Sequence, residues 1–180
     1  MQPDSPLDPA VRDLLYQIKF GTNVQRNEAI DSAPILGVKA IRHLSRLMAA
    51  WKTPGQFRGA HEAIKRIVLN GYRTGGEESA VTAELLKLIE SAQSENLRRE
   101  ALYLLGFASS AESVPALAAL LDDQVLREDA RMALERNASR EAESALRTAQ
   151  RRSDGPWRSA LDYSVRRRRV SLKDVGTRRY

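Results

Sequence analysis

The sequence predicts an all-α fold, an α-solenoid (α/α superhelix) of about four to five stacked helical hairpins. Strand signals are nearly absent, because aromatic residues make up only 6% of the 180-residue chain and no stretch keeps a strict alternation of apolar and polar residues. Apolar residues instead recur at helical spacing in segments of roughly 10 to 15 residues between short polar turns. A helix-starting pattern also repeats along the chain, as expected of stacked repeats.

Local start and stop signals place the helices. Asp8 is suited to be an N-cap and Pro9 to be the first helical residue, while Pro34 and the Asn70-Gly71 pair are expected to end helices. The helices predicted in this way cover residues 9–20, 24–33, 38–51, 56–69, 78–91, 95–108, 112–121, 125–137, 139–151 and 156–168. The chain is thus expected to form a disordered leader (1–7), one repeat array (8–168) and a basic tail (169–180) that is extended or disordered from Val170.

The internal repeat is clearest in the second half of the chain. Residues 97–105 align with 126–134 and more loosely with 157–165, at spacings of 29 and 31 residues. Between the first two copies, residues 113–123 form a partner helix with apolar residues at helical spacing. One such hairpin cannot bury its own apolar face, whereas stacked copies share a continuous core.

This repeat pattern resembles HEAT repeats, in particular the short bacterial variety also found in phycobilisome lyase-type proteins. Residues 97–121 carry the typical unit: an apolar residue and Arg, Ala101, Leu105, a turn, Val114-Pro-Ala-Leu117 and a Leu-Leu pair. Residues 126–150 keep only the first helix of the unit. The resemblance implies that the arginines at helix starts, Arg98, Arg127 and Arg158, make contacts between repeats, and that the second helix of each hairpin lines a concave binding surface.

Basic residues on two of these second helices are the candidate binding residues within the array. On helix 38–51, Ile41, Leu44 and Met48 are predicted to face the core, so the basic side chains lie on the opposite face. Guanidinium groups bind carboxylates and phosphates in bidentate geometry. A solvated helix face is the alternative. The candidate residues are Lys39, Arg42, Arg46, Arg140, Arg147 and Arg151.

The excess positive charge lies at the C-terminal end. Residues 136–180 contain 13 Lys and Arg against 5 Asp and Glu, although the whole chain has a net charge of only +6. A nucleic-acid contact, a docking tail for an acidic protein and a solubilising cap of the array all fit this pattern. The tail candidates are Arg166, Arg167, Arg168, Arg169, Lys173, Arg178 and Arg179.

The composition offers little for catalysis. The chain has no cysteine and two histidines, and neither a phosphate loop nor a hydrolase or metalloprotease motif occurs in it. We therefore expect no catalytic residue, no metal and no cofactor. The N-terminus does not resemble a signal peptide and no segment is apolar over a membrane-spanning length, so we expect no membrane insertion and a cytoplasmic location.

The sequence favours a non-catalytic scaffold or adaptor that binds an acidic partner protein through the concave face and the basic C-terminal end. One alternative is a module that binds nucleic-acid phosphates. A second is an accessory subunit of a modifying or chromophore-lyase enzyme. The oligomeric state stays open.

Overall fold

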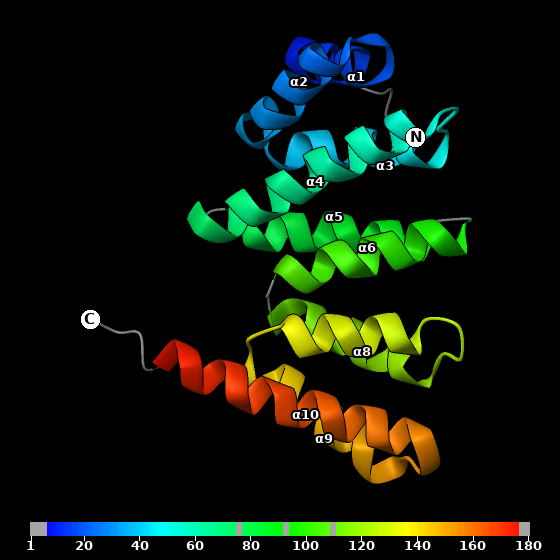
Figure 1. Cartoon of the computed structure of the whole chain (residues 1–180), viewed down its shortest axis with the longest axis vertical. Helices are drawn as coiled ribbons and strands as arrows, with labels where there is room; N and C mark the ends of the chain where they lie inside the picture. Colours follow the sequence, from blue (N-terminus) through cyan, green and yellow to red (C-terminus); the bar gives the residue numbers. More distant parts are fainter. Residues whose placement is uncertain (1–6, 75–76, 92–93, 109–110, 177–180) are drawn as a thin grey trace. The chain divides into compact units, whose positions relative to one another are not determined.

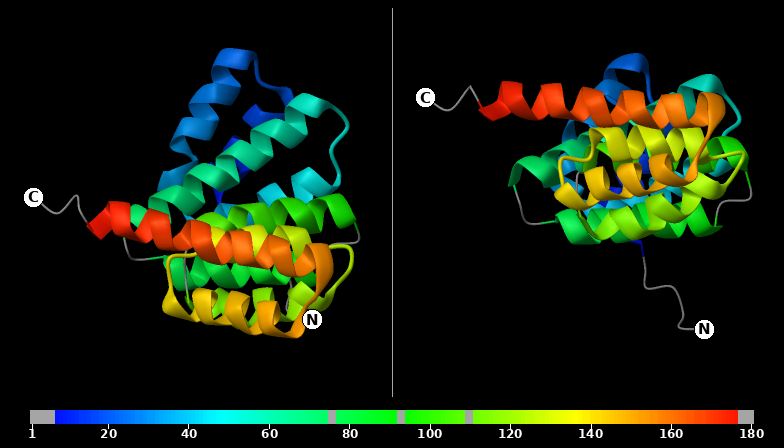
Figure 2. Two further views of the ribbon diagram at one scale, coloured as in Figure 1. Left: turned by 60° about the horizontal axis from the view of Figure 1, so that its bottom comes forward. Right: turned by 90° about the horizontal axis from the view of Figure 1, so that it is seen from below.

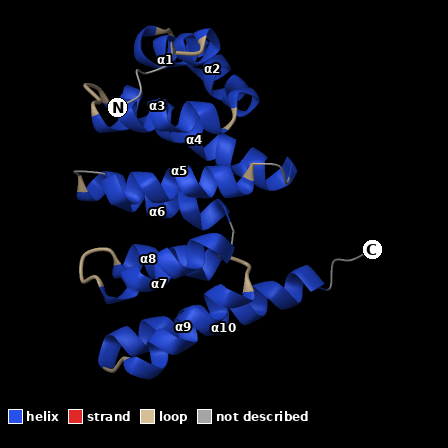
Figure 3. Ribbon diagram, turned by 180° about the vertical axis from the view of Figure 1, so that it is seen from behind, coloured by secondary structure: helices blue, strands red, loops and turns tan. Residues whose placement is uncertain are grey.

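The computed structural model describes residues 7–74, 77–91, 94–108 and 111–176, with side chains up to Arg168 apart from those of 71–74. All regular elements within these ranges are helical, so the all-α prediction is confirmed (Figure 3). The predicted leader, except Leu7, and the predicted Gly75-Gly76 loop lie outside the described residues.

The helices divide between two compact units, Met1–Arg98 and Arg99–Tyr180, whose boundary falls within α6. The helices are α1 (Pro9–Phe20), α2 (Asn23–Leu36), α3 (Val38–Ala49), α4 (Pro54–Thr74), α5 (Glu78–Ser91), α6 (Glu95–Ala108), α7 (Val114–Ala119), α8 (Arg127–Arg136), α9 (Arg140–Arg152) and α10 (Gly155–Gly176) (Figure 1). Short 3-10 turns, η1 (Ala111–Ser113) and η2 (Leu120–Asp122), flank α7.

The predicted start of the first helix is confirmed. The Asp8 carboxylate accepts a hydrogen bond from the Ala10 N–H at 2.9 Å, and Pro9 opens α1 where its missing N–H has no cost. The next helix begins with a capping box: Thr22 accepts from the Gln25 N–H at 3.3 Å, while the Gln25 side chain accepts from the Thr22 N–H at 2.9 Å. Local sequence therefore determines where α1 and α2 begin.

Three predicted helix ends are wrong. Pro34 lies inside α2, which ends at Leu36 before Gly37, and Gly37 adopts the left-handed φ of +59° that a glycine reaches without strain. Gly71 lies inside α4, whose packing against α2 and α3 outweighs a glycine penalty of about 1 kcal/mol. The backbone of α10 stays helical to Gly176 because no proline or glycine interrupts it earlier, and extending a helix is easier than starting one.

In the first unit, α2 and α3 pack against α4, and α3 also packs against α5. The predicted inward face of α3 is confirmed, since Ile41, Leu44 and Met48 are at most 1% exposed. Ile64 of α4 and Leu85 of α5 are fully buried as well. The side of α3 that carries its basic residues is therefore held facing solvent.

In the second unit, α7, α8 and α9 pack against one another, and α10 packs on α8 and α9. Helices α9 and α10 lie side by side and run in opposite directions (Figure 2). Leu117, Leu134, Leu146 and Leu161, one from each helix, are completely buried. Each helix thus contributes a leucine to one shared core.

We predict that Leu117→Ala lowers the free energy of unfolding by about 2 to 5 kcal/mol, because it leaves a cavity in this core. Chemical denaturation followed by circular dichroism measures the loss. Met132→Ala is the matched control, because Met132 of the same unit is 41% exposed and its truncation should cost less than about 0.5 kcal/mol. Equal effects of the two changes would contradict the packing of α7.

Candidate binding surface

Several arginines are used inside the fold, where they satisfy the C-terminal ends of preceding helices. The last carbonyls of an α-helix have no intrahelical partner and need one when they are not solvated. The Arg26 guanidinium donates to the carbonyls of Ile18 and Gly21, both at 3.1 Å, at the end of α1. Arg98 of α6 donates to the Ile89 carbonyl at 3.1 Å, near the end of α5. These two arginines are structural.

Arg168 has the same role at the end of α8, so its prediction as a partner-binding residue of the tail is wrong. Its side chain is only 3% exposed. Its guanidinium donates to the carbonyls of Leu134 at 2.6 Å, Glu135 at 3.2 Å and Ser139 at 2.7 Å, and also to that of Asn137. Burial lowers the pKa of this guanidinium, although the nearby Glu143 and Glu135 carboxylates oppose the shift.

We predict that Arg168→Ala lowers the free energy of unfolding by about 2 to 4 kcal/mol, because it strands buried carbonyls at the junction of α8 and α9. The measurement is a urea titration of the full chain. Arg166→Ala on the same helix is the control, since the Arg166 side chain is 71% exposed and should change the midpoint little. A harmless Arg168→Ala would show that water replaces these bonds.

The three arginines that the sequence pattern predicted to join neighbouring repeats are Arg98, Arg127 and Arg158. As described above, Arg98 bonds to α5. The Arg127 guanidinium lies over the Trp157 ring at 4.8 Å from its centroid, which joins α8 to the start of α10. Arg158 is exposed. The contacts of Arg98 and Arg127 therefore lie within the units.

Of the other candidates at the C-terminal end, two form contacts within the fold, and the side chains of the rest lie outside the described residues. Arg166 forms an ion pair with Asp162. Arg167 donates to the Tyr163 hydroxyl at 3.3 Å and lies 3.4 Å from the Glu135 carboxylate. Both side chains still expose more than 60% of their area. The side chains of Arg169, Lys173, Arg178 and Arg179 lie outside the described residues.

The candidates on α9 are also partly engaged. Two N–H groups of the Arg147 guanidinium, Nε and Nη2, donate to one carboxylate oxygen of Glu143, at 2.9 and 2.6 Å. Arg151 donates to the Thr148 hydroxyl at 3.1 Å. Arg140 is exposed and makes no hydrogen bond or ion pair within the described residues. The net positive charge that this face presents is therefore weaker than the sequence suggests.

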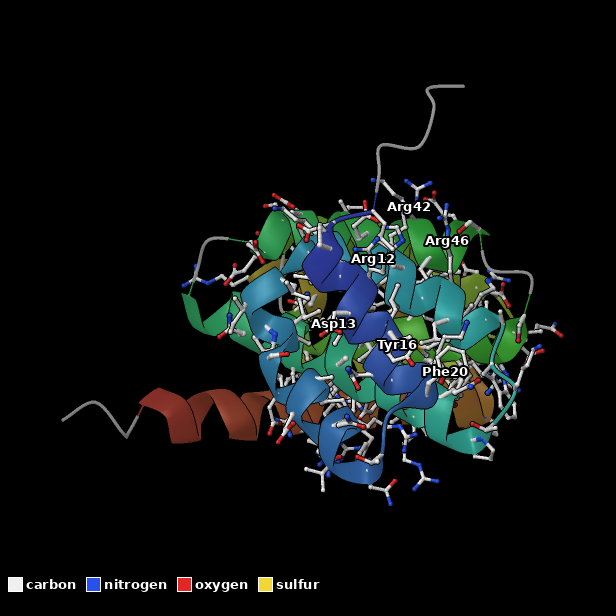
Figure 4. All side chains as sticks on the ribbon, turned by 90° about the horizontal axis from the view of Figure 1, so that it is seen from above. Arg12, Asp13, Tyr16, Phe20, Arg42 and Arg46 are labelled. Atoms are coloured by element: carbon white, nitrogen blue, oxygen red, sulfur yellow. The ribbon has the colours of Figure 1, made fainter. Side chains whose placement is uncertain are left out.

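The candidates on α3 differ, because two of them line a groove. Lys39, Arg42 and Arg46 are exposed, and none forms an ion pair within the described part of the chain. Figure 4 shows Arg42 and Arg46 projecting away from the body of this unit. Together with residues of α5 and the start of α6, they line a groove of about 800 Å³. The lining comprises Arg42, Ser45, Arg46, Ala49, Glu84, Lys87, Leu88, Glu90, Ser91, Ser94 and Leu97.

Sequence reasoning missed the second wall of this groove. The predicted surface on α3 contained only cations, whereas α5 adds Glu84, Lys87 and Glu90. Lys87 is paired with Glu84 at 2.6 Å. A charged i, i+3 pair is common on solvated helices, so nothing in the sequence marks these residues as part of a site. Their position opposite Arg42 and Arg46 follows only from the packing of α3 on α5.

The described residues contain neither a metal-binding cluster nor a membrane-spanning helix. No group of three or more His, Cys, Asp or Glu side chains in these ranges is arranged to hold a metal ion. None of the helices, as far as they are described, combines the length and apolar character needed to cross a bilayer.

Comparisons with known proteins give no family. No family model matches the chain, and no curated protein matches it. Among solved structures it is similar to the crystal structure of an engineered protein, with 17% sequence identity, coverage of 91% of this chain and 85% of that chain, and a TM-score of 0.46.

Proposed function

We propose that this chain is a cytoplasmic, non-catalytic scaffold or adaptor, a HEAT-like solenoid of about four to five helical hairpins that binds an acidic segment of a partner protein. The observation that carries the proposal is the groove of about 800 Å³ in the first unit, lined by Arg42 and Arg46. Both guanidinium groups lack an ion pair among the described residues, so both are available to a carboxylate.

The packing within each unit supports the solenoid part of the proposal. In a solenoid each helix contacts the helices next to it in sequence and those one further on. In the first unit α3 packs on α4 and α5, and α2 packs on α4, while the terminal helix α1 reaches one helix further than this rule and also contacts α4. In the second unit α8 packs on α9 and α10, and α7 packs on α8 and α9.

The engagement of Arg168 and Arg147 supports placing the site on α3, and Arg140, which is unpaired within the described residues, does not line the groove. Arg168 is buried, and Arg147 already holds a carboxylate of its own helix. A partner that binds Arg147 has to compete with Glu143, whereas a partner that binds Arg42 or Arg46 displaces only water. Lys39 lies about one turn before Arg42 on the exposed side of α3. Its charge adds to the positive field at the groove.

We predict that the double variant Arg42→Glu, Arg46→Glu reduces partner binding at least about 10-fold, since each lost charge contact becomes a repulsion. The melting temperature should stay nearly unchanged, because neither side chain has an ion pair to lose. The measurement is a pull-down from nuclease-treated lysate of the source cells, with the retained protein quantified and its acidic segment mapped.

The matched control is Lys52→Glu, Arg58→Glu in the same unit, because both side chains are exposed and neither forms an ion pair within the described residues. It changes the net charge equally, and neither residue lines the groove. If the control reduces binding as much as the groove variant does, general charge attraction explains the interaction and the proposed site is wrong.

One observation favours nucleic-acid binding as a second candidate function. On α10, Tyr163 is 55% exposed and lies one turn before the exposed Arg167. Arg166 immediately precedes Arg167. Aromatic rings beside cations are used by proteins that stack single-stranded bases. This function predicts recovery of nucleic acid without nuclease, a steep dependence of affinity on salt concentration, and a loss on Tyr163→Ala but not on the α3 variant.

A further inference from the structure

The groove between α3 and α5 presents unpaired charges of opposite sign. Arg42 and Arg46 lie on the α3 side, and Glu90 lies on the α5 side. Glu84 and Lys87 neutralise each other at 2.6 Å. Glu90 is exposed and, like Arg42 and Arg46, makes no hydrogen bond or ion pair within the described residues. A ligand that carried only negative charge would be attracted by one wall and repelled by Glu90 on the other.

The spacing of the two arginines suits an extended ligand. Arg42 and Arg46 are four residues apart on a helix, which corresponds to about 6 Å along its axis. In an extended chain, side chains i and i+2 point to the same side and lie about 6.6 Å apart, while residue i+1 points to the opposite side. An extended segment running along α3 can therefore offer acidic side chains at i and i+2 to the two arginines, with residue i+1 directed at α5.

The serines of the groove suit an extended backbone as well. An extended segment has N–H and C=O groups that need partners, whereas a helix satisfies its own. Ser45, Ser91 and Ser94 line the groove, and the Ser91 hydroxyl already donates to the Lys87 carbonyl at 2.7 Å, so Ser91 can only accept from a ligand. Ser45 is 5% exposed, and its buried hydroxyl has no hydrogen-bond partner. Because Ser45 lines the groove, a ligand backbone seated there can supply the missing partner.

We infer that the groove binds an extended peptide segment in which acidic and basic side chains alternate, with two acidic residues facing Arg42 and Arg46 and a basic residue between them facing Glu90. This inference rests on the proposed function and narrows its acidic partner to one charge pattern. Among the lining residues, Ala49 and Leu88 offer apolar surface for a flanking apolar side chain.

The test measures the affinities of the full chain for three fluorescent peptides with identical Gly/Ser flanks, by anisotropy at low ionic strength. Their cores are Glu-Lys-Glu, Lys-Glu-Lys and Glu-Glu-Glu. We expect the wild-type chain to bind the first peptide about 5- to 150-fold more tightly than the second, because the first peptide forms two or three exposed ion pairs where the second meets like charges. The third should bind more weakly than the first because of Glu90.

A charge-swapped chain with Arg42→Glu, Arg46→Glu and Glu90→Arg tests the orientation of the ligand. It should prefer the Lys-Glu-Lys peptide by a similar factor, which a merely destabilised protein would not do. Unchanged melting by circular dichroism checks that the variant is folded.

The other outcomes separate this inference from the proposed function. If Glu-Glu-Glu binds as tightly as Glu-Lys-Glu and needs Arg42 and Arg46, the alternating pattern is overturned and the acidic-partner function stands. If the swapped chain keeps the wild-type preference, the ligand's acidic residues do not face Arg42 and Arg46 and its basic residue does not face Glu90, so the proposed orientation is overturned. If no peptide binds while the pull-down retains a partner through Arg42 and Arg46, the extended-peptide inference alone fails.

Discussion

The ends of the short helices impose the constraint on which much of this structure depends. Each helix leaves its last carbonyls without intrahelical partners, and the ten helices within the described residues give many such ends. At the end of α1, the Gln17 carbonyl accepts from the Gly21 N–H, that of Ile18 from Arg26 and that of Lys19 from Gln56. At the end of α8, Arg168 serves the carbonyls of two successive residues and two more in the following turn.

This use of arginine determines which positive charges are available to a partner. Arginine is suited to the structural role because its planar fork reaches several carbonyls at once and its long stem packs against apolar side chains. Arg26, Arg98 and Arg168 are held in this way, while Arg147 is held by an acid on its own helix. Arg42 and Arg46 are held neither by a carbonyl nor by an acid within the described residues. They line the groove between α3 and α5.

The groove also shows why the net charge of a helix face is an incomplete description of a binding surface. On α3 alone the exposed side is cationic, but the neighbouring α5 adds Glu84 and Glu90 beside Lys87. Charges of both signs therefore line one groove, and this is the basis of the charge pattern that we infer for its ligand. Binding specificity of this kind arises from repulsion of wrong partners as much as from attraction.

The sequence by itself determined the all-α class, the start of α1 at Asp8 and Pro9, the full extents of α5 and α6, and the buried and exposed sides of α3, because these follow from short-range signals and helical periodicity. It misplaced the ends of α2, α4 and α10, where packing or simple continuation of the helix outweighed Pro34, Gly71 or a weak pattern. Only the tertiary structure decided that Arg168 is buried and that Glu90 lies opposite Arg42 and Arg46. The physical reason is that the role of an arginine depends on which carbonyl or carboxylate it meets, and such partners come from other helices.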